Sequence, residues 1–468
     1  MNSQWPLQSS RRAFLTNISL LAAGSLAGSK PHFFNERKLR VCLIGTGIRG
    51  TSFWGKRLVD QYSDILEFVG LADINPGRLA LAKSYMGVTC PTFSSCTEML
   101  QTANPDLLIV TTKDSTHHEF IIEGLNYGCD VLTEKPLTVD EEKCQDIIDA
   151  ERRSPANLIV GFNYRWSPYM TEVKSLLSKG SIGDITSVDF HWYLNNYHGA
   201  SYFRRWHGLR QDGGTLLVHK ATHHFDLLNW WIDSDPEEVF AFGDLEHYGS
   251  AGPYHGKNCR NCAHTTSCKY YWDITKSEHM MRLYVDHEHH DGYIRDNCLF
   301  RKEINIYDKM SVQVKYANNT IVNYSLTTYS PFEGWRIAFN GRKGRIEAFE
   351  DIPYYENMAI GQEDLHAAEM SHGETSGQNR PVILHKNWED FEMVPVEISR
   401  QGHGGGDQRL QDKIFRSPES SDPLRHAAGL RDGAMSILIG IAARKSIESG
   451  VPVRISSLTD LEPRAKRI

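Results

Sequence analysis

The sequence contains no apolar run long enough to cross a membrane and no long run of basic residues. A membrane helix needs roughly 18 or more consecutive apolar residues. Chains that bind the nucleic-acid backbone usually carry an excess of Lys and Arg. Here 51 Lys and Arg oppose 58 Asp and Glu, which gives a formal net charge of −7. We therefore expect neither a membrane span nor a nucleic-acid partner.

Cysteine is also scarce, with nine residues in a chain of 468. A low and odd number excludes a small disulfide-rich scaffold and complete internal pairing. The remaining composition, 40% hydrophobic and 23% charged, is that of ordinary globular proteins. A chain of this length corresponds to two or three domains.

The first thirty residues have the order of features found in an export signal. The pair Arg11-Arg12 precedes a weakly apolar stretch, residues 18–27, that ends in small residues. The twin arginine resembles a Tat signal, whose pathway carries folded proteins. We predict a signal peptide at residues 1–29 and a periplasmic or otherwise exported protein. An N-terminal tail that merely contains Arg-Arg is the alternative.

A short apolar segment, residues 40–44, leads into a glycine-rich turn and then into a predicted helix, residues 51–62. A GxGxxG pattern between a strand and a helix indicates a dinucleotide site. The first glycine permits the tight turn, the second lets a pyrophosphate approach the backbone, and the third lets the helix pack on the strand. The helix N-terminus favours the anion. The residues expected to bind the cofactor here are Gly45, Gly47, Ile48, Arg49 and Gly50.

The second predicted strand, residues 66–72, ends at Asp73, 23 residues beyond Gly50. An acidic residue near this spacing hydrogen-bonds the adenosine ribose and repels a 2′-phosphate, which favours NAD over NADP. Arg78, five residues further on, could favour a phosphate instead. A helix N-cap is the structural alternative for Asp73.

Three more apolar segments, residues 107–110, 129–133 and 158–162, complete a predicted doubly wound parallel sheet. Ligands of such sheets bind beyond the carboxyl ends of the strands. We therefore predict an NAD-binding Rossmann domain at residues 38–160. The residues expected to line its crevice after these strands are Thr112, Asp114, His117, Glu134 and Lys135.

Five features together resemble the glucose–fructose oxidoreductase / inositol dehydrogenase / MocA (Gfo/Idh/MocA) family. They are the Gly45 turn, Asp73, Glu134-Lys135-Pro136, the segment Gly161-Phe162-Asn163-Tyr164-Arg165, and Gly213-Gly214 followed by His223-His224-Phe225-Asp226. The resemblance implies a second, α+β domain at residues 161–468 with a largely antiparallel open sheet. Members are typically oxidoreductases of sugars, cyclitols or their derivatives, and a minority use a bound NAD to cleave glycosidic bonds.

The resemblance also implies catalytic residues. Family members use the Lys of Glu-Lys-Pro near the reacting hydroxyl, which is Lys135 here. A later His falls on His223 and a later Asp on Asp226, whereas His219 occupies a position where relatives carry Asp. This departure leaves the identity of the base open among Lys135, His219 and His223. The residues expected to contact the substrate are Asn163, Tyr164, Arg165, Lys220, Asp226 and His403.

Histidine suits proton transfer because its ordinary pKa of roughly 6.5 lies near working pH. Residues 216–232 are predicted to form one helix, in which His219 and His223 share a face at i, i+4. Such a pair could instead bind a metal ion or be a buried structural pair. A second predicted helix, residues 430–449, is amphipathic and structural.

A polar insertion, about residues 250–300, contains Cys259, Cys262, Cys268 and Cys298. Four thiolates with this spacing are compatible with a structural zinc site. An Fe–S cluster, two disulfides or unpaired thiols are the alternatives. Folding in a reducing cytoplasm before export favours the metal.

Two functional classes follow. The first is an NAD-dependent dehydrogenase acting on a hydroxyl of a sugar, glycoside or cyclitol. The second is an NAD-assisted glycosidase that oxidises the sugar transiently and breaks the bond by elimination. A non-catalytic sugar-binding protein is a weaker third. Because free NAD should be scarce outside the cytoplasm, we expect a tightly bound cofactor. An exposed open sheet favours a homo-oligomer.

Overall fold

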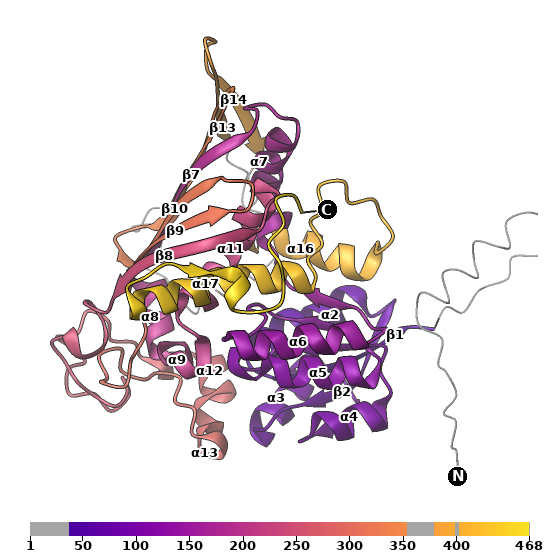
Figure 1. Ribbon diagram of the computed structural model, residues 1–468. Helices are drawn as coiled ribbons and strands as arrows, with labels where there is room; N and C mark the ends of the chain where they lie inside the picture. The colour runs from indigo at the N-terminus through magenta and orange to yellow at the C-terminus, as the bar shows by residue number, and fades with distance from the viewer. Residues whose placement is uncertain (1–36, 353–378, 398–401, 468) are drawn as a thin grey trace, which may run out of the picture.

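The structure, a computed structural model, describes residues 37–352, 379–397 and 402–467 (Figure 1). The predicted signal peptide lies outside the described residues. Within them, no helix combines the length and the apolar character that crossing a membrane would require.

The N-terminal part is a six-stranded parallel sheet with the strand order β3-β2-β1-β4-β5-β6. Its strands are β1 (Leu39–Ile44), β2 (Leu66–Ala72), β3 (Thr92–Phe93), β4 (Leu107–Val110), β5 (Asp130–Thr133) and β6 (Leu158–Val160). The strand order reverses between β1 and β4, which is the switch point where parallel sheets bind ligands. The predicted doubly wound sheet is confirmed.

Helices cover both faces of this sheet (Figure 1). They are the π-helical segment η1 (Arg49–Lys56) with α2 (Arg57–Tyr62), α3 (Pro76–Met86), α4 (Cys96–Ala103), α5 (His117–Tyr127) and α6 (Glu141–Arg153). Their apolar side chains pack on strands that are buried throughout, such as β4, as expected for a parallel sheet covered on both sides.

The second part is built on a nine-stranded sheet with the order β14-β13-β12-β11-β7-β10-β9-β8-β15. Only β7 and β10 run parallel, and all other pairs are antiparallel. The strands are β7 (Ile185–Asn195), β8 (Pro236–Asp244), β9 (Lys309–Tyr316), β10 (Ile321–Ser330), β11 (Glu333–Gly341), β12 (Gly344–Ile352), β13 (Asn379–Lys386), β14 (Glu392–Glu397) and β15 (Val453–Arg454).

One face of this sheet is packed and the other is exposed. Strand β9 alternates buried and exposed residues along its length, so its buried side joins the core formed with the helices. Those helices include α7 (Pro168–Ser178), α8 (Asn196–Arg204), α9 (Arg210–Gly213), α10 (Leu216–His219), α11 (Ala221–Ile232) and α17 (Leu430–Ser449). Phe242 and Ile321 lie on the open face with 68% and 52% of their surface exposed.

Two helix predictions have different outcomes. Helix α17 covers the predicted residues 430–449. The predicted helix 216–232 is instead two helices, α10 and α11, with Lys220 between them. The chain enters α10 through Thr215, whose φ of +104° is rare for a residue with a side chain.

The insertion between β8 and β9 folds around its own small core. Its short helices α12 (Glu278–Leu283) and α13 (Glu288–Asp291) follow a loop that carries the first three cysteines, and the fourth comes after α13. Ile274, Met280, Leu283 and Tyr284 form a buried apolar cluster in it. Arg260 bridges Glu288 and Asp296.

The structure does not support the predicted zinc site in this insertion. All nine cysteines are unpaired thiols. In the described part of the chain, the only group of three or more metal-ligand atoms within 4.8 Å of one another contains no cysteine. Cys259, Cys262, Cys268 and Cys298 therefore do not assemble a ligand set. The apolar cluster and the ion pairs of Arg260 stabilise the insertion.

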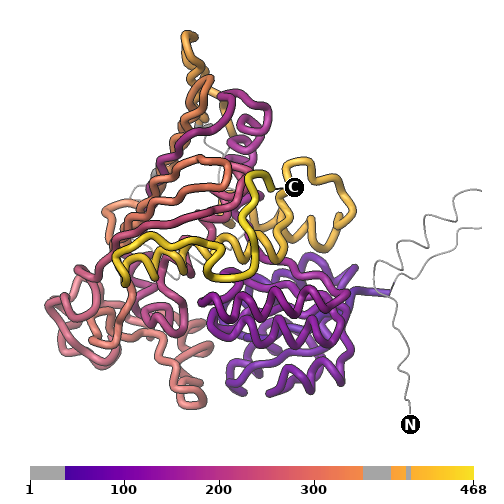
Figure 2. The backbone as a smooth tube through the Cα atoms, viewed as in Figure 1, coloured from indigo at the N-terminus to yellow at the C-terminus, as the bar shows by residue number. Residues whose placement is uncertain are grey.

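The C-terminal part of the chain returns to the Rossmann sheet (Figure 2). Helix α16 (Gly406–Gln411) and the π-helical segment η9 (Asp412–Arg416) place Leu410 and Phe415 in one apolar cluster with Phe53 and Tyr62. The Gln411 amide also donates to the main-chain oxygen of Phe53. These contacts hold residues 402–416 against the first helix of the nucleotide-binding sheet.

Candidate active site

The glycine turn after β1 has the shape that a dinucleotide requires. Gly45 has φ +93°, and a Cβ there would lie 2.6 Å from the backbone of Thr111. A Cβ on Gly50 would lie 2.1 Å from the Gly45 oxygen. At Gly47 the nearest heavy atom is the Tyr284 hydroxyl, at 3.7 Å. Two glycines are therefore needed for packing, and Gly47 leaves its side of the turn open to a ligand.

Asp73 is nearly buried at the end of β2, next to this turn. Its carboxylate accepts hydrogen bonds from the Thr46 amide at 2.6 Å and from the Asn75 amide at 2.7 Å. The N-cap of α3 is Asn75, whose side chain accepts from the Arg78 amide. The N-cap alternative for Asp73 is therefore wrong.

Arg78 is committed to carboxylates. Its guanidinium pairs with Asp291 of the insertion and lies 3.6 Å from Asp73. The positive charge that could favour a 2′-phosphate is thus neutralised by two acidic side chains.

Glu134 and His117 hold the loops after β5 and β4. The buried Glu134 carboxylate accepts from Arg49 Nε at 2.6 Å and from Trp54 Nε1 at 2.7 Å. Both ring nitrogens of His117 lie within hydrogen-bond distance of main-chain oxygens, Pro136 at 2.8 Å and Thr112 at 3.2 Å. Arg49, Thr112, His117 and Glu134 thus lie at the predicted crevice, where their polar atoms are engaged by the protein.

Asp114, His207 and His219 form a buried cluster within electrostatic range of Lys135. His219 Nδ1 lies 2.5 Å from Asp114 Oδ2. The rings of His207 and His219 are 4.0 Å apart. One ligand atom from each of the three residues lies within 4.8 Å of the others, so their donor set could also hold a metal ion. His219 thus pairs with Asp114 and His207 rather than with His223.

His207 was missed from the sequence because no motif marks it. Its one signal is its place in an aromatic segment that also contains Trp206, on which its ring stacks at 3.6 Å. His207 Nδ1 is buried and has no hydrogen-bond partner among the described residues.

Burial and charge set the protonation of these groups. Burial lowers the pKa of Lys135 to about 8, although Glu134 and Asp114 act in the opposite direction. Burial, together with the charge of Lys135, lowers the pKa of His219 and His223 well below the ordinary value. Both imidazoles are therefore neutral near pH 7, and Lys135 is the group that titrates near working pH.

A second cluster surrounds Tyr164. The ring of His223 stacks on it at 4.2 Å with an interplanar angle of 11°, and the ring of His403 is 5.4 Å away. Lys220 Nζ donates to the Tyr164 hydroxyl at 3.0 Å. The tertiary structure thus brings together four predicted site residues from three distant segments.

His403 is held in this cluster by a carboxylate that the sequence did not single out. His403 Nδ1 lies 3.1 Å from both oxygens of Asp407. Asn163 Nδ2 donates to the same carboxylate at 2.6 Å. Asn163 and His403 are therefore fixed by one shared partner.

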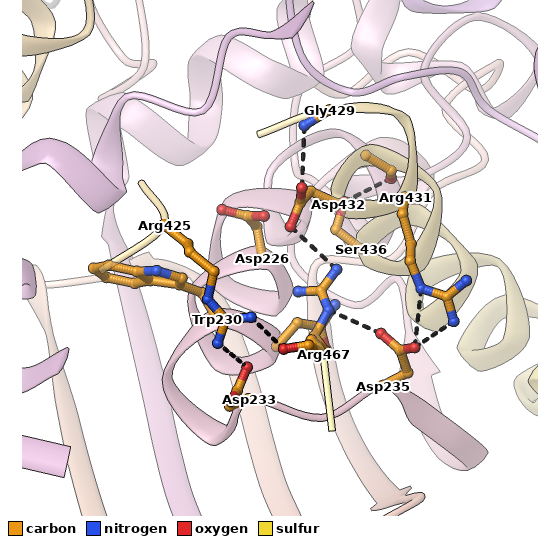
Figure 3. Close-up of polar contacts among 12 residues, drawn as sticks. Asp226, Trp230, Asp233, Asp235, Arg425, Gly429, Arg431, Asp432, Ser436 and Arg467 are labelled. Atoms are coloured by element: carbon orange, nitrogen blue, oxygen red, sulfur yellow. Dashed lines mark hydrogen bonds and ion pairs between the residues drawn. The ribbon is translucent and has the colours of Figure 1, made fainter. Parts of the chain in front are cut away.

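Arg165 and Asp226, both predicted to contact substrate, are bound to each other in the structure. Arg165 Nε donates to Asp226 Oδ2 at 2.7 Å, and both side chains are 1% exposed. Arg165 also bonds Asp432 of α17. Figure 3 shows how Arg467 then links Asp432 to Asp235. This network joins α11, α17 and the C-terminal tail, and so positions the helix that carries His223.

Two family models match the chain. The description "Oxidoreductase family, NAD-binding Rossmann fold" matches residues 39–162, and "Oxidoreductase family, C-terminal alpha/beta domain" matches residues 174–455. Both are models of the Gfo/Idh/MocA family.

Curated relatives agree with these models. A protein named as an oxidoreductase, YteT of Bacillus subtilis, is 34% identical over 444 residues, which cover 90% of this chain and 99% of that one. An inositol 2-dehydrogenase/D-chiro-inositol 3-dehydrogenase of Lactiplantibacillus plantarum is 24% identical over 204 residues, 43% of this chain and 55% of that one.

Solved structures share the fold at low identity. The WlbA dehydrogenase of Bordetella pertussis, in complex with NADH and UDP-GlcNAcA, has a TM-score of 0.59 at 17% identity and covers 90% of this chain and 98% of its own. A levoglucosan dehydrogenase, in complex with NADH and levoglucosan, has a TM-score of 0.59 at 16% identity and covers 90% and 100%.

Proposed function

Because this chain belongs to the Gfo/Idh/MocA family of oxidoreductases, we propose that it transfers hydride between NAD and a hydroxyl-bearing carbon of a sugar, glycoside or cyclitol. The observation that carries the proposal is the Asp114–His219 pair, buried beyond the carboxyl ends of the strands and within electrostatic range of Lys135. The inositol and levoglucosan dehydrogenases among the similar proteins support a polyol substrate.

The residues divide the chemistry as follows. NAD, when bound, accepts the hydride that leaves the alcohol carbon. Lys135, as the neutral amine, takes the hydroxyl proton on Nζ. His219 Nδ1 and Asp114 Oδ2 share one hydrogen; with that hydrogen on Nδ1, the Nε2 of His219 is unprotonated and can accept a hydrogen bond. His223, fixed against Tyr164, presents a neutral imidazole to the same region.

The carboxylates near the glycine turn support NAD rather than NADP. A 2′-phosphate close to Asp73 would meet this carboxylate and that of Asp291, with Arg78 as their shared counter-ion. Repulsion between these carboxylates and the phosphate would weaken the binding of NADP.

Contacts between the insertion and the Rossmann sheet support a tightly held cofactor. The Ile48 amide, in the glycine turn, donates to the Tyr284 hydroxyl at 3.1 Å. The Asn75 side chain donates to the main-chain oxygen of His287 at 2.9 Å. With the Arg78–Asp291 ion pair, these bonds form what we term the clasp: Ile48–Tyr284, Asn75–His287 and Arg78–Asp291. The clasp stands at the mouth of the predicted dinucleotide site.

A retained cofactor is what an exported oxidoreductase would need, and we propose export by the N-terminal Arg11-Arg12 signal. Fractionation of cells that carry the full chain, with and without Arg11→Lys/Arg12→Lys, tests this proposal.

We also propose self-association through the open sheet face, where Phe242 and Ile321 are exposed. Light scattering on the purified protein tests it.

The function is tested by incubating purified protein with a panel of sugars, cyclitols and aryl glycosides while nicotinamide absorbance is followed. Net reduction of the cofactor, or of an added acceptor, is the expected result. Release of the aglycone without net reduction would instead identify the redox-assisted glycosidase. No reaction and no change of absorbance with any compound would contradict both.

A further inference from the structure

Lys220 is a buried cation that has no acidic partner in the described chain. Its surface is 4% exposed, and its ammonium donates to the neutral Tyr164 hydroxyl at 3.0 Å. Across residues 37–352, 379–397 and 402–467, no ion pair links Lys220 to a carboxylate. A charge removed from water usually requires an opposite charge or dipole, because desolvation of an unpaired ion is costly.

Two other buried cations of this protein are compensated, one by carboxylates and one by a helix end. Arg165 is bound by Asp226 and Asp432. Lys174, which is also 4% exposed, donates to the main-chain oxygen of Trp230 near the carboxyl end of α11, where the helix dipole favours a positive charge. Lys220 lies at the opposite, N-terminal end of α11, where the dipole of this helix does not favour a positive charge.

Aromatic faces surround Lys220 without neutralising it. The ammonium is 5.3 Å from the ring centres of both Tyr164 and Trp192, and these two rings stack on each other. Cation–π contacts stabilise a cation less than a carboxylate partner does inside a protein. The two faces do provide apolar surface of the kind that the C–H groups of a sugar ring cover.

A second cation shares this region. After burial, the charges of Lys135 and Lys220 are the main causes that lower the pKa of His223 and His224. The two ammonium groups therefore act on the same imidazoles. The carboxylates of Asp114 and Glu134 partly offset the positive charge of Lys135. No carboxylate among the described residues pairs with Lys220, so the site has excess positive charge around Lys220.

We propose that the substrate supplies the missing charge: it is a sugar that carries a carboxylate, such as a uronic acid or its glycoside, and Lys220 binds that carboxylate. The inference rests on the proposed function and narrows its substrate class. A singly charged carboxylate balances one ammonium, whereas a phosphate would leave excess negative charge.

The test compares matched substrates on the protein with its cofactor. 4-Nitrophenyl glucuronide and galacturonide are measured against the corresponding glucoside and galactoside, the uronate methyl esters and the sugar 6-phosphates. We expect kcat/KM for one uronate to exceed that of its methyl ester and of the neutral sugar at least tenfold. Equal values, or preference for the phosphate, would overturn the proposal. Reduction of the cofactor by neutral sugars alone would leave the proposed function standing, and no reduction at all would remove both.

Variants locate the effect. Lys220→Met should raise KM for the uronate at least tenfold more than it raises KM for the neutral sugar, and Lys220→Arg should recover part of the uronate affinity. Lys174→Met removes a buried ammonium that does not contact Tyr164. This variant should leave KM for the uronate and KM for the neutral sugar unchanged. Equal losses on acid and neutral sugar in Lys220→Met would show a structural role instead. If Lys220→Met fails to fold, the comparison of uronate with methyl ester on the unaltered protein decides.

Discussion

At the scale of single residues, the site depends on a lysine whose charge is easily lost. Lys135 follows β5, and burial brings its pKa to about 8. The neighbouring imidazoles have their pKa values lowered further by the same burial, so they stay neutral over the working range. A base needs a pKa close to the working pH to be effective. This difference favours Lys135 over His219 and His223 as the proton acceptor.

We therefore predict that kcat/KM for alcohol oxidation rises with pH through an inflection near 8. The sign follows from the role: only the neutral amine accepts a proton, so activity is lost as pH falls through the pKa of Lys135. Lys135→Ala should lower turnover at least tenfold, lack this inflection and retain bound cofactor. If the pH dependence of kcat/KM in Lys135→Ala showed the same inflection as in the unaltered protein, another group would be the proton acceptor.

Residue-level prediction succeeded where a motif fixes the local backbone. The Gly45 turn follows from a strand, a turn and a helix that are contiguous, so sequence spacing alone determines it. His207 and Asp407 carry no such mark. They acquire their partners, His219 and His403, only when separate segments pack together.

At the scale of elements, the Arg165 network fixes α11 against α17. Arg165 follows β6, Asp226 belongs to α11 and Asp432 to the first turn of α17. Removing one partner of a buried ion pair leaves an uncompensated charge, which is costlier than the pair itself.

We predict that Asp226→Ala lowers the free energy of unfolding by about 3–5 kcal/mol. Because α11 carries His223, turnover should fall as well, while KM changes less. Chemical denaturation followed by fluorescence measures the first effect and steady-state kinetics the second. Asp460→Ala, which removes the exposed partner of Arg152, is the control and should leave stability nearly unchanged. Equal stability of the two variants would contradict the role given to Asp226.

The break between α10 and α11 belongs to the same scale. Periodicity predicted one helix at 216–232, but Lys220 separates two. A continuous helix would keep His219 and His223 on one face. In the structure His219 reaches Asp114 and His223 reaches Tyr164, which divides the two imidazoles between the cofactor loops and the predicted substrate cluster.

At the scale of the whole molecule, the insertion and the C-terminal segment both contact the Rossmann sheet. The insertion does so through the clasp, and residues 402–416 through Leu410 and Phe415. The two segments lie far apart in the sequence, yet each contacts the half that is expected to bind NAD.

We predict that weakening the clasp speeds the loss of NAD. Tyr284→Phe/Asp291→Asn removes the hydroxyl that accepts from Ile48 and the charge that pairs with Arg78, so release of the cofactor should accelerate at least tenfold. Bound NAD that remains after timed gel filtration is the measurement. Glu278→Gln, at an exposed position of the same insertion, is the matched control. Unchanged retention in the double variant would mean that the clasp does not hold the cofactor.

The sequence by itself determined the parallel sheet, its glycine turn, the strand-end position of Lys135 and the family. These features follow from contiguous patterns, in which apolar segments, turns and helix starts are set by neighbours along the chain. Only the tertiary structure decided which side chains meet. Arg165 bonds Asp226 and Asp432, 61 and 267 residues away, and His219 bonds Asp114, 105 residues away. The four cysteines of the insertion, by contrast, form no ligand set. Such partners depend on how separate elements pack, and packing brings distant side chains together in ways that spacing along the chain does not encode.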